Sequence, residues 1–409
     1  MKNIIKAFDY LVYWSIVFLP FSISISPAPM NVFMGFLIVG FLAKKLLKKK
    51  IIFINTAINT PLALLFLVTC LSVFNSISFS ETFRAGIVRL IDYILVFFAV
   101  SSEIRDQKHI RRIIFLTAAG LTLASFDTIW QVITGHDFIR GYEPVINIGL
   151  VRATASFKDS NTLGIYLSGL APLVFGLAIY HLKGLKRMAL FFISLLILTG
   201  IVLTYSRPTL LAIYIALFFF ALIKKDKVLL ALLLILTLVS PFILPRSVKD
   251  WARQVNYNPL RFMCNDDRIA VYRNALNMIK AHPVIGVGAG AFMKSYKKYK
   301  EFPEYRNVVT LDEMKAHNNF LHMAAEIGLV GFGIFVWMLY KLFMECINTY
   351  RHLDDKFFKV ILLSLSASLI SFLINGLTES SLYYSRVAII FWYLVGFSLS
   401  LKKFAPGAS

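Results

Sequence analysis

The residues with the clearest chemical potential open a hydrophobic segment late in the chain. His317 and Asn318 begin the stretch HNNFLHMAAEIGLVG, directly after a long basic loop. Histidine exchanges protons near neutral pH, so an imidazole at this boundary can act as a general base. A structural histidine at a helix start is the alternative. His322 follows five residues later and would face another side of a helix, and no HExxH pattern is present, so no zinc site is predicted.

Three arginines could bind an anion near that histidine. Arg207 lies in TYSRPTLLA, in a tight turn between two apolar segments. There an arginine can extend to lipid headgroups or make bidentate hydrogen bonds to a phosphate. Arg268 occupies the first turn of a predicted helix, beside free backbone N–H groups that favour anions. Arg273 follows five residues later, about 140° around the helix, so one of this pair is predicted to be a surface residue.

Further polar residues complete the candidate set. Glu379 lies in NGLTESSLYYSR, between the last two apolar segments, where a carboxylate could orient the histidine or be an ordinary loop residue. Arg89 and Asp92 are three residues apart within an apolar segment. They could form a structural pair or serve a substrate. The other candidate substrate-binding residues, all in short external loops or turns, are Arg84, Arg152 and Tyr205.

The segments that position these residues have the composition of membrane helices. The 409-residue chain is 58% hydrophobic with a mean hydropathy of +0.71, which excludes an ordinary soluble protein. Apolar runs long enough to cross the bilayer recur throughout, and backbone in lipid must form helices. We therefore predict an all-α polytopic membrane protein with about twelve transmembrane helices and one large helical external loop. The predicted spans lie near 10–26, 30–47, 61–77, 87–101, 112–133, 162–181, 187–204, 208–223, 228–244, 317–346, 357–377 and 385–401.

The distribution of basic residues predicts the orientation. If the N-terminus is cytoplasmic, the inside segments hold 22 basic residues and the short outside loops about six. This excess follows the positive-inside rule and places both termini in the cytoplasm. The long loop at 246–316 is the exception, since it is external and carries 13 basic against 7 acidic residues. Its charge indicates an anionic partner on the external face.

The predicted organisation has three parts within one integral-membrane domain. Residues 1–245 hold nine spans, 246–316 form the external loop, and 317–403 hold three more spans. An amphipathic helix is predicted at 267–281, with an apolar stripe of Ile269, Tyr272, Leu276 and Ile279. The following GVGAG forms a turn rather than a dinucleotide site, because no strand precedes it. Cys70, Cys264 and Cys346 lie in separate regions, which disfavours disulfides and a cysteine-based metal site.

Three motifs appear together in a known order. HNNFLHMAAEIGLVG fits H-[NSQ]-x9-G-x-x-[GTY] through His317, Asn318, Gly328 and Gly331. Arg207 with Leu211 fits R-x3-L, and DDRIAVYRNALNMIKAHPVIGVGAGAF is similar to the loop block that precedes the histidine. The chain therefore resembles the O-antigen ligase superfamily, which includes WaaL-type ligases and Wzy-type polymerases.

The resemblance implies a GT-C-like glycosyltransferase of lipopolysaccharide biosynthesis that uses no nucleotide sugar. Such ligases lie in the Gram-negative inner membrane and act at its periplasmic face. They transfer a polysaccharide from undecaprenyl pyrophosphate to a hydroxyl of lipid A–core, without a metal or other cofactor. The implied partners are these two substrates and membrane lipids, and no nucleic acid. If the roles of the family's motif residues are carried over to this sequence, Arg207 and Arg268 bind the pyrophosphate and His317 activates the acceptor hydroxyl. Asn318 belongs to the same motif, and Glu379 falls where the family can have an acidic residue.

Other functions remain open at this stage. A Wzy-type polymerase shares the motif and the donor but uses another lipid-linked repeat as acceptor, and a protein O-oligosaccharyltransferase uses a serine or threonine. The chain length, the twelve spans and the single large loop favour the ligase. A transporter of a lipid-linked glycan is the alternative from another class. It would be expected to carry ionisable residues through many mid-span positions, and this chain has few.

Overall fold

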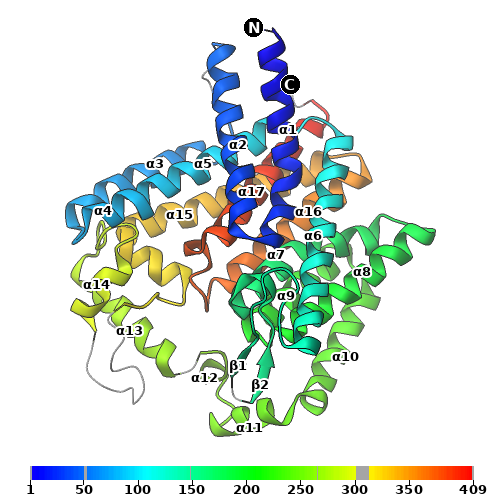
Figure 1. The fold of residues 1–409 in the computed structure, drawn as a ribbon, viewed down its shortest axis with the longest axis vertical. Coiled ribbons are helices and arrows are strands. Elements are labelled where there is room, and N and C mark those ends of the chain that lie inside the picture. Colours follow the sequence, from blue (N-terminus) through cyan, green and yellow to red (C-terminus); the bar gives the residue numbers. More distant parts are fainter. Residues whose placement is uncertain (1, 50–52, 148, 265, 301–312, 408–409) are drawn as a thin grey trace.

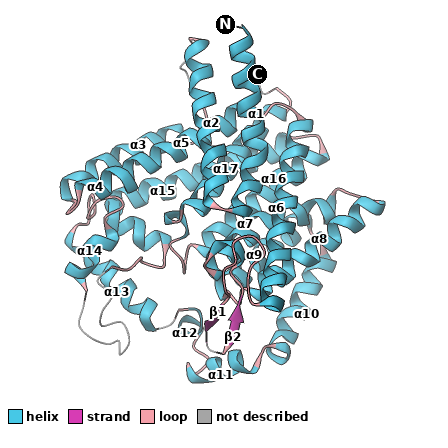
Figure 2. Ribbon diagram, in the orientation of Figure 1, coloured by secondary structure: helices cyan, strands magenta, loops and turns pink. Residues whose placement is uncertain are grey.

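The part of the chain that the computed structural model describes, residues 2–49, 53–147, 149–264, 266–300 and 313–407, is built almost entirely from helices (Figures 1 and 2). The all-α prediction is confirmed. The elements, with their bounds, are α1 (Lys2–Ile25), α2 (Pro27–Leu47), α3 (Asn59–Leu71), η1 (Ser72–Asn75), α4 (Phe79–Glu81), the π-helix η2 (Thr82–Val88), α5 (Arg89–Glu103), α6 (Gln107–Thr134), β1 (Val145–Asn147), β2 (Leu150–Arg152), η3 (Ala155–Phe157), α7 (Ser160–Tyr180), α8 (Gly184–Leu203), α9 (Arg207–Lys224), α10 (Lys227–Ile243), α11 (Arg246–Gln254), α12 (Pro259–Met263), α13 (Asp266–Ala281), α14 (Phe292–Tyr299), α15 (Asn319–His352), α16 (Lys356–Asn375), η4 (Ser381–Tyr383), α17 (Ser385–Ser400) and η5 (Leu401–Phe404).

Many of these helices are suited to cross a membrane. The described residues contain ten helices that are long and apolar enough, or up to eleven if α10 and α11, which meet at an 88° bend, form one span. The stretch Asn59–Asn75 is a shorter apolar helix. The predicted number of about twelve spans is reached only if both of these are counted. In Figure 1 the two termini lie at one end of the molecule, whereas α11, α12 and the β-hairpin lie at the other.

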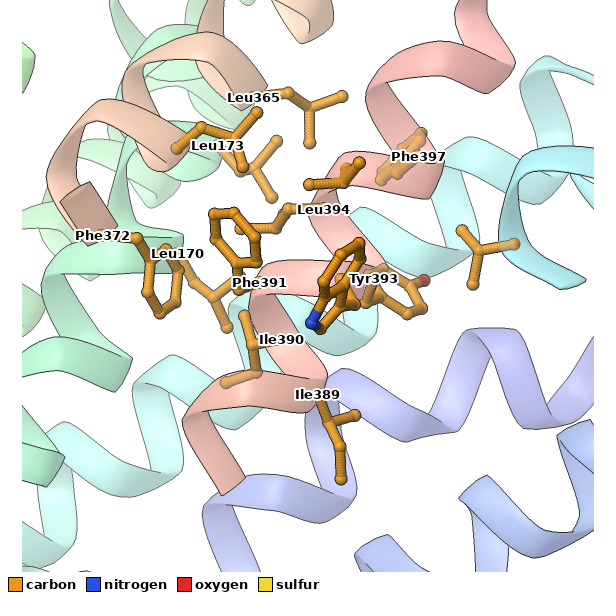
Figure 3. Packing of buried hydrophobic residues seen from close by; sticks show 14 of the residues in the cluster. Leu170, Leu173, Leu365, Phe372, Ile389, Ile390, Phe391, Tyr393, Leu394 and Phe397 are labelled. Carbon is orange, nitrogen blue, oxygen red and sulfur yellow. The ribbon is translucent and has the colours of Figure 1, made fainter. Parts of the chain in front are cut away.

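The core of the molecule lies around three C-terminal and central helices. α7, α16 and α17 are the most buried of the candidate spans. Figure 3 shows Phe391 of α17 between side chains of α7 and α16, with its ring centroid 6.4 Å from that of Phe372. Gly169 of α7 leaves room for the Phe372 ring, because a Cβ there would overlap it. These helices provide the rigid frame on which the polar segments are mounted.

A two-stranded antiparallel hairpin, which we had not predicted, lies between α6 and α7. β1 pairs with β2 in the register Val145↔Arg152 and Ile146↔Val151. Gln131 of α6 anchors the chain that follows, because its Oε1 accepts hydrogen bonds from the Thr154 and Ala155 amides at 2.7 and 2.9 Å. The hairpin therefore fixes the position of Arg152 at the end of β2.

The long helix α15 is broken at Gly328. This residue has φ 71° and ψ 177°, a conformation that interrupts the helical hydrogen-bond ladder. The backbone groups that the break releases are satisfied by the turn that ends α13 and contains GVGAG. The Val287 and Gly288 amides donate to the carbonyls of Ala325 and Glu326 at 2.9 and 3.0 Å, and the Leu329 amide donates to the Pro283 carbonyl at 2.7 Å. The external loop is thus joined to a membrane helix by backbone hydrogen bonds, as a helix break at membrane depth requires.

The predicted helix in the external loop is present, but its apolar stripe was partly wrong. The buried side chains of α13 include Val271, Ala275 and Met278, whereas Leu276 is 45% exposed. The predicted and the observed apolar stripes both have helical spacing. The observed stripe is rotated around the helix axis relative to the predicted one, because α13 packs on α15 and α14. The small side chains Ala324 and Ala325 of α15 lie in the same buried cluster. This rotation turns Tyr272 toward His317, where its hydroxyl donates to the His317 carbonyl at 3.1 Å.

We predict that Gly328→Ala destabilises the protein. A Cβ at this position would overlap the Val284 backbone, and the positive φ is itself unfavourable for alanine. The expected loss is on the order of 1–3 kcal/mol, measured as a fall of several degrees in the Tm of the purified protein in detergent. Gly333→Ala is the matched control, because no atom lies within 4 Å of its Cβ position. Equal Tm values for the two variants would contradict this account of the helix break.

Candidate functional site

One buried carboxylate gathers side chains from several distant segments. Glu379, in the turn between α16 and η4, has a side chain that is only 3% exposed. Its Oε1 accepts hydrogen bonds from Arg268 of α13 and from the Asn161 amide of α7, the latter at 2.7 Å. Its Oε2 lies 3.2 Å from Nδ1 of His317. A carboxylate in this position is the common partner of a base and an arginine.

These contacts keep the Glu379 carboxylate charged. Burial alone would raise its pKa. The hydrogen bond from His317 and the positive charge of Arg268 act in the opposite direction and outweigh burial, so the pKa of Glu379 lies below its ordinary value. The group is therefore an anion at neutral pH and can only accept hydrogen bonds.

The imidazole of His317 is oriented by that anion. Because the carboxylate accepts, the shared proton resides on Nδ1, which leaves the lone pair of Nε2 available as a base. The side chain is 28% exposed, and within the described parts of the chain Nε2 has no hydrogen-bond partner. The backbone of His317 has φ 48°, a conformation that side chains rarely adopt and that is found preferentially at functional sites.

Asn318 holds this histidine in place. Its Oδ1 accepts from the amides of Phe320 and Leu321, both at 2.9 Å, and thereby caps α15. Its Nδ2 donates to the Leu377 carbonyl at 2.8 Å, in the turn that bears Glu379. We predicted a substrate-binding role from the sequence, but both ends of this side chain are already bonded within the protein. The geometry is that of a residue that positions His317.

Arg152 connects the same carboxylate to the turn between α8 and α9, which precedes Arg207 and is called the arginine turn below. Its Nε donates to the Thr204 carbonyl at 3.0 Å, and Nη2 donates to Oδ1 of Asn161 at 2.8 Å. Asn161 in turn donates to Glu379. Burial lowers the pKa of Arg152, and the nearby charge of Arg268 lowers it further, whereas Asp159 and Glu379 raise it. The adjoining Tyr205 has φ 46°, so this turn also contains backbone strain.

Arg207 presents unused donors next to this network. Its Nη1 donates to the Phe262 carbonyl, and its guanidinium lies over the rings of Trp251 and Phe262 at 5.7 and 5.4 Å. An arginine has five N–H donors, so four have no acceptor among the described residues. The group lies within electrostatic reach of both Arg268 and Arg152. Three guanidinium groups, of which Arg268 bonds directly to Glu379, therefore lie near one another, and the local charge is positive.

Four helices begin at this place. α7, α9, α13 and α15 start within three residues of Asn161, Arg207, Arg268 and His317, respectively. The N-terminus of each helix carries unpaired N–H groups and a partial positive charge. Together with the arginines, these termini favour a ligand with negative charge. Among the residues described, no cluster of three or more His, Cys, Asp or Glu side chains could hold a metal ion.

The remaining predicted residues lie outside this network. Arg273 is exposed on α13 and contacts neither Glu379 nor His317. Arg84 is exposed on η2. Arg89 lines a separate cavity, and no ion pair joins it to Asp92 within the described residues, so the structural pair considered from the sequence is not formed.

Three residues of the site were missed by the sequence analysis. Asn161 occupies the first turn of α7, and nothing in its spacing connects it with Glu379 far along the chain. Tyr272 was assigned to an apolar stripe, although its hydroxyl bonds to His317. Lys315 was counted only as a loop charge, yet its Nζ lies 3.5 Å from the Tyr384 ring centroid. Its place two residues before His317 was the one available signal.

The comparison with protein families agrees with this geometry. Residues 192–336 match the family described as O-Antigen ligase (Wzy_C). This segment of the chain is similar to the O-antigen ligase family. The match includes Arg207, Arg268, His317 and both motif glycines, Gly328 and Gly331. The predicted resemblance to the superfamily is thereby confirmed.

The family assigns a coarse activity to the chain. O-antigen ligases and related polymerases are glycosyltransferase-like enzymes that use a lipid-linked glycan donor and a lipid acceptor, and the many apolar helices make this a multi-pass membrane protein. A search of curated proteins finds no match to the chain. Glu379, Arg152 and Asn161 lie outside the matched segment, so the network joins this segment to β2, to α7 and to the turn after α16.

We predict that the Glu379 carboxylate stabilises the fold in a pH-dependent way. Its pKa in the folded protein is lowered, so its contribution is fully present above its unfolded pKa, near 4.5, and is lost as the pH falls through the folded pKa. The Tm difference between the wild type and Glu379→Gln should therefore be largest at neutral pH and shrink below about pH 4.5. Glu143→Gln, at an exposed position, is the control. A Tm difference that did not change with pH would contradict the ionised state of Glu379.

Proposed function

We propose that this protein is an O-antigen ligase that transfers a glycan from undecaprenyl pyrophosphate to a hydroxyl of lipid A–core. The observation that supports the proposal most directly is the shared carboxylate, since Glu379 contacts both the candidate base His317 and the candidate phosphate ligand Arg268. The active site would lie at the periplasmic face of a Gram-negative inner membrane, with both termini in the cytoplasm. Neither a cofactor nor a metal takes part.

In this proposal the arginines bind the donor. Arg207 directs its unused N–H groups toward the diphosphate, and Arg268 adds a second guanidinium. A diphosphate becomes more negative as it leaves, and fixed positive groups that match this charge lower the barrier. Arg152 holds the arginine turn against Asn161 and so keeps Arg207 in place. The four helix N-termini act on the same developing charge.

His317 activates the acceptor. The acceptor hydroxyl oxygen attacks the anomeric carbon of the donor glycan, the bond from that carbon to the diphosphate oxygen breaks, and the electron pair leaves with the diphosphate. The hydroxyl proton passes to Nε2 of His317. Glu379 stabilises the imidazolium that forms, because its Oε2 faces Nδ1. The partial exposure of His317 gives an acceptor access to Nε2.

We expect His317→Ala to abolish transfer while leaving donor binding intact. Loss of a general base costs about 10²–10⁴-fold in rate. Transfer is measured with purified protein, undecaprenyl-pyrophosphate-linked glycan and lipid A–core, and donor binding is measured separately. His136→Ala, at an exposed loop position, is the control and should retain full activity. Transfer by His317→Ala at the wild-type rate would remove the base assignment.

We expect Arg207→Ala to weaken donor binding and transfer together, and Arg207→Lys to restore little of either. A lysine offers a point charge in place of the planar fork that binds phosphate in a bidentate manner. The expected loss in kcat/KM for the donor is about tenfold or more, and it should persist in chelator. A strict requirement for a divalent ion, or full activity of the alanine variant, would exclude this arrangement.

The same assay separates the ligase from the polymerase alternative. A ligase joins the glycan to lipid A–core, whereas a polymerase extends another lipid-linked repeat. In the native host, loss of a ligase leaves full-length polymer on the carrier lipid, and loss of a polymerase leaves single repeats on the core. Turnover with either acceptor also distinguishes an enzyme from a transporter.

A further inference from the structure

A cavity lies beside the site, between helices that are suited to cross a membrane. It has a volume of about 110 Å³ and is lined by residues of α3, η2, α5, α15 and α17 together with part of the GVGAG turn. One water requires roughly 10–15 Å³ by this measure, so a group of several heavy atoms fits. Its polar lining includes Arg89, Glu326, Thr69 and Tyr383. The cavity is thus mostly apolar with a small polar part, a lining suited to an amphipathic substrate group.

Arg89 is the cation among the residues that line this cavity, and its side chain is exposed rather than enclosed by protein. It lies ten residues after Phe79, within the candidate span Phe79–Glu103. No hydrogen bond or ion pair to this side chain is present in the described part of the protein. A charged residue within a membrane span is costly unless a partner or a ligand neutralises it. The unengaged guanidinium therefore indicates a place for an anion.

The helix that bears Arg89 is built irregularly at this point. The π-helix η2 ends at Val88, directly before Arg89. A π-helical turn contains one additional residue and changes the direction of the side chains that follow, and such turns are frequent at functional sites. Gly86 in this turn packs against the Ala289 backbone, because a Cβ would lie 2.7 Å from its carbonyl oxygen. The external loop therefore forms one wall of the cavity.

The acidic residue of the cavity is already occupied. Oε1 of Glu326 accepts from the Phe292 amide at 3.1 Å and lies 3.3 Å from Nε2 of His322. His322 also contacts the Ser380 hydroxyl at 3.0 Å and stacks on Tyr383 at 3.6 Å between ring centroids. This cluster is buried and bonded within the protein, so it forms a fixed wall rather than a partner for Arg89.

Lys315 lies between the cavity and the first site, because its Nζ is 3.5 Å from the ring centroid of Tyr384, the neighbour of the cavity-lining Tyr383. Burial lowers the pKa of Lys315, the charge of Arg89 lowers it further, and Asp159 and Glu379 raise it. The ammonium group thus lies within electrostatic range of both Arg89 and Glu379, two residues from His317. Cations extend from Arg207 through Arg268 and Lys315 to Arg89, with the candidate base His317 between the two ends.

We propose that Arg89 and Lys315 form a second anion-binding site, which takes a phosphate of the acceptor lipid. The inference rests on the proposed function, since it assigns the donor diphosphate to Arg207 and Arg268 and the acceptor phosphate to the cavity beside α5. A lipid whose phosphate is held at Arg89 presents its hydroxyl groups toward His317. Two lipid-borne substrates can then approach one base from different sides of α15.

The first experiment measures acceptor recognition. Full-length protein in phosphatidylcholine nanodiscs is assayed with undecaprenyl-pyrophosphate-linked glycan and lipid A–core, before and after removal of the acceptor phosphates with hydrofluoric acid. For Arg89→Gln we expect a rise of about tenfold in KM for the phosphorylated acceptor and an unchanged KM for the donor. With the dephosphorylated acceptor, the wild type and the variant should be equal. Arg89→Lys should recover part of the loss.

Controls separate this effect from a general loss of charge or fold. Arg140→Gln removes an exposed arginine that stacks on Tyr142 at 4.6 Å, and it should behave as the wild type. An equal effect of Arg89→Gln on both acceptors would overturn the proposal, as would a rise in KM for the donor.

A binding measurement does not depend on turnover. The His317→Ala protein, alone and combined with Arg89→Gln, is titrated with bis-phosphorylated lipid A in the same nanodiscs. Weaker binding by the double variant supports the acceptor site even if no transfer is detected, and a lack of transfer by the wild type then counts against the proposed function alone. Equal binding overturns the proposal.

Nanodiscs containing phosphatidylglycerol test the other source of lipid phosphate. If Arg89 serves bulk phospholipid, the effect of Arg89→Gln will appear only in these nanodiscs and will not depend on the acceptor phosphates. That result would overturn the assignment to the acceptor.

Discussion

A buried carboxylate without partners is too costly to persist, and Glu379 meets this constraint by collecting donors from distant parts of the chain. Arg268, His317 and Asn161 reach it from the external loop, the start of α15 and the start of α7. Removing one partner from such a group leaves an uncompensated charge. The same contacts that stabilise the anion therefore fix the separation and the orientation of the base and the arginine. Stability and chemistry depend here on one interaction.

The second structural constraint is the broken helix α15. Gly328 interrupts the ladder, and the released carbonyls of Ala325 and Glu326 accept hydrogen bonds from the GVGAG turn. Gly331 then leaves room for the Ile327 side chain. The family motif that begins at His317 thus has a physical explanation at both ends. Its first residues place an imidazole at the start of α15, and its glycines fasten the turn after α13 to that helix.

The tertiary structure gathers an excess of positive charge around the motif that begins at His317. Arg268 bonds to the Glu379 carboxylate, Arg152 reaches it through Asn161, and Arg207 lies within electrostatic reach of both arginines. Four helices begin beside these residues. Lys315 extends the positive region toward Arg89 in the cavity beside α5. Such an arrangement is unfavourable until an anion binds, because like charges are held close together in a partly dry environment. Lipid-linked phosphates are the anions available at a membrane boundary, and the O-antigen ligase family uses a substrate of this kind.

Hydropathy was enough to predict the all-α membrane fold, because a backbone in lipid has almost no other choice. Local spacing likewise indicated the histidine, the arginine turn and the loop helix, since each lies within a short contiguous motif. The partners could not be predicted in this way. Glu379 was a loose match, Asn161 gave no distinctive pattern, and the apolar stripe predicted for α13 was only partly right. Those features depend on how helices far apart in sequence pack and rotate against one another, and only the tertiary structure sets that packing.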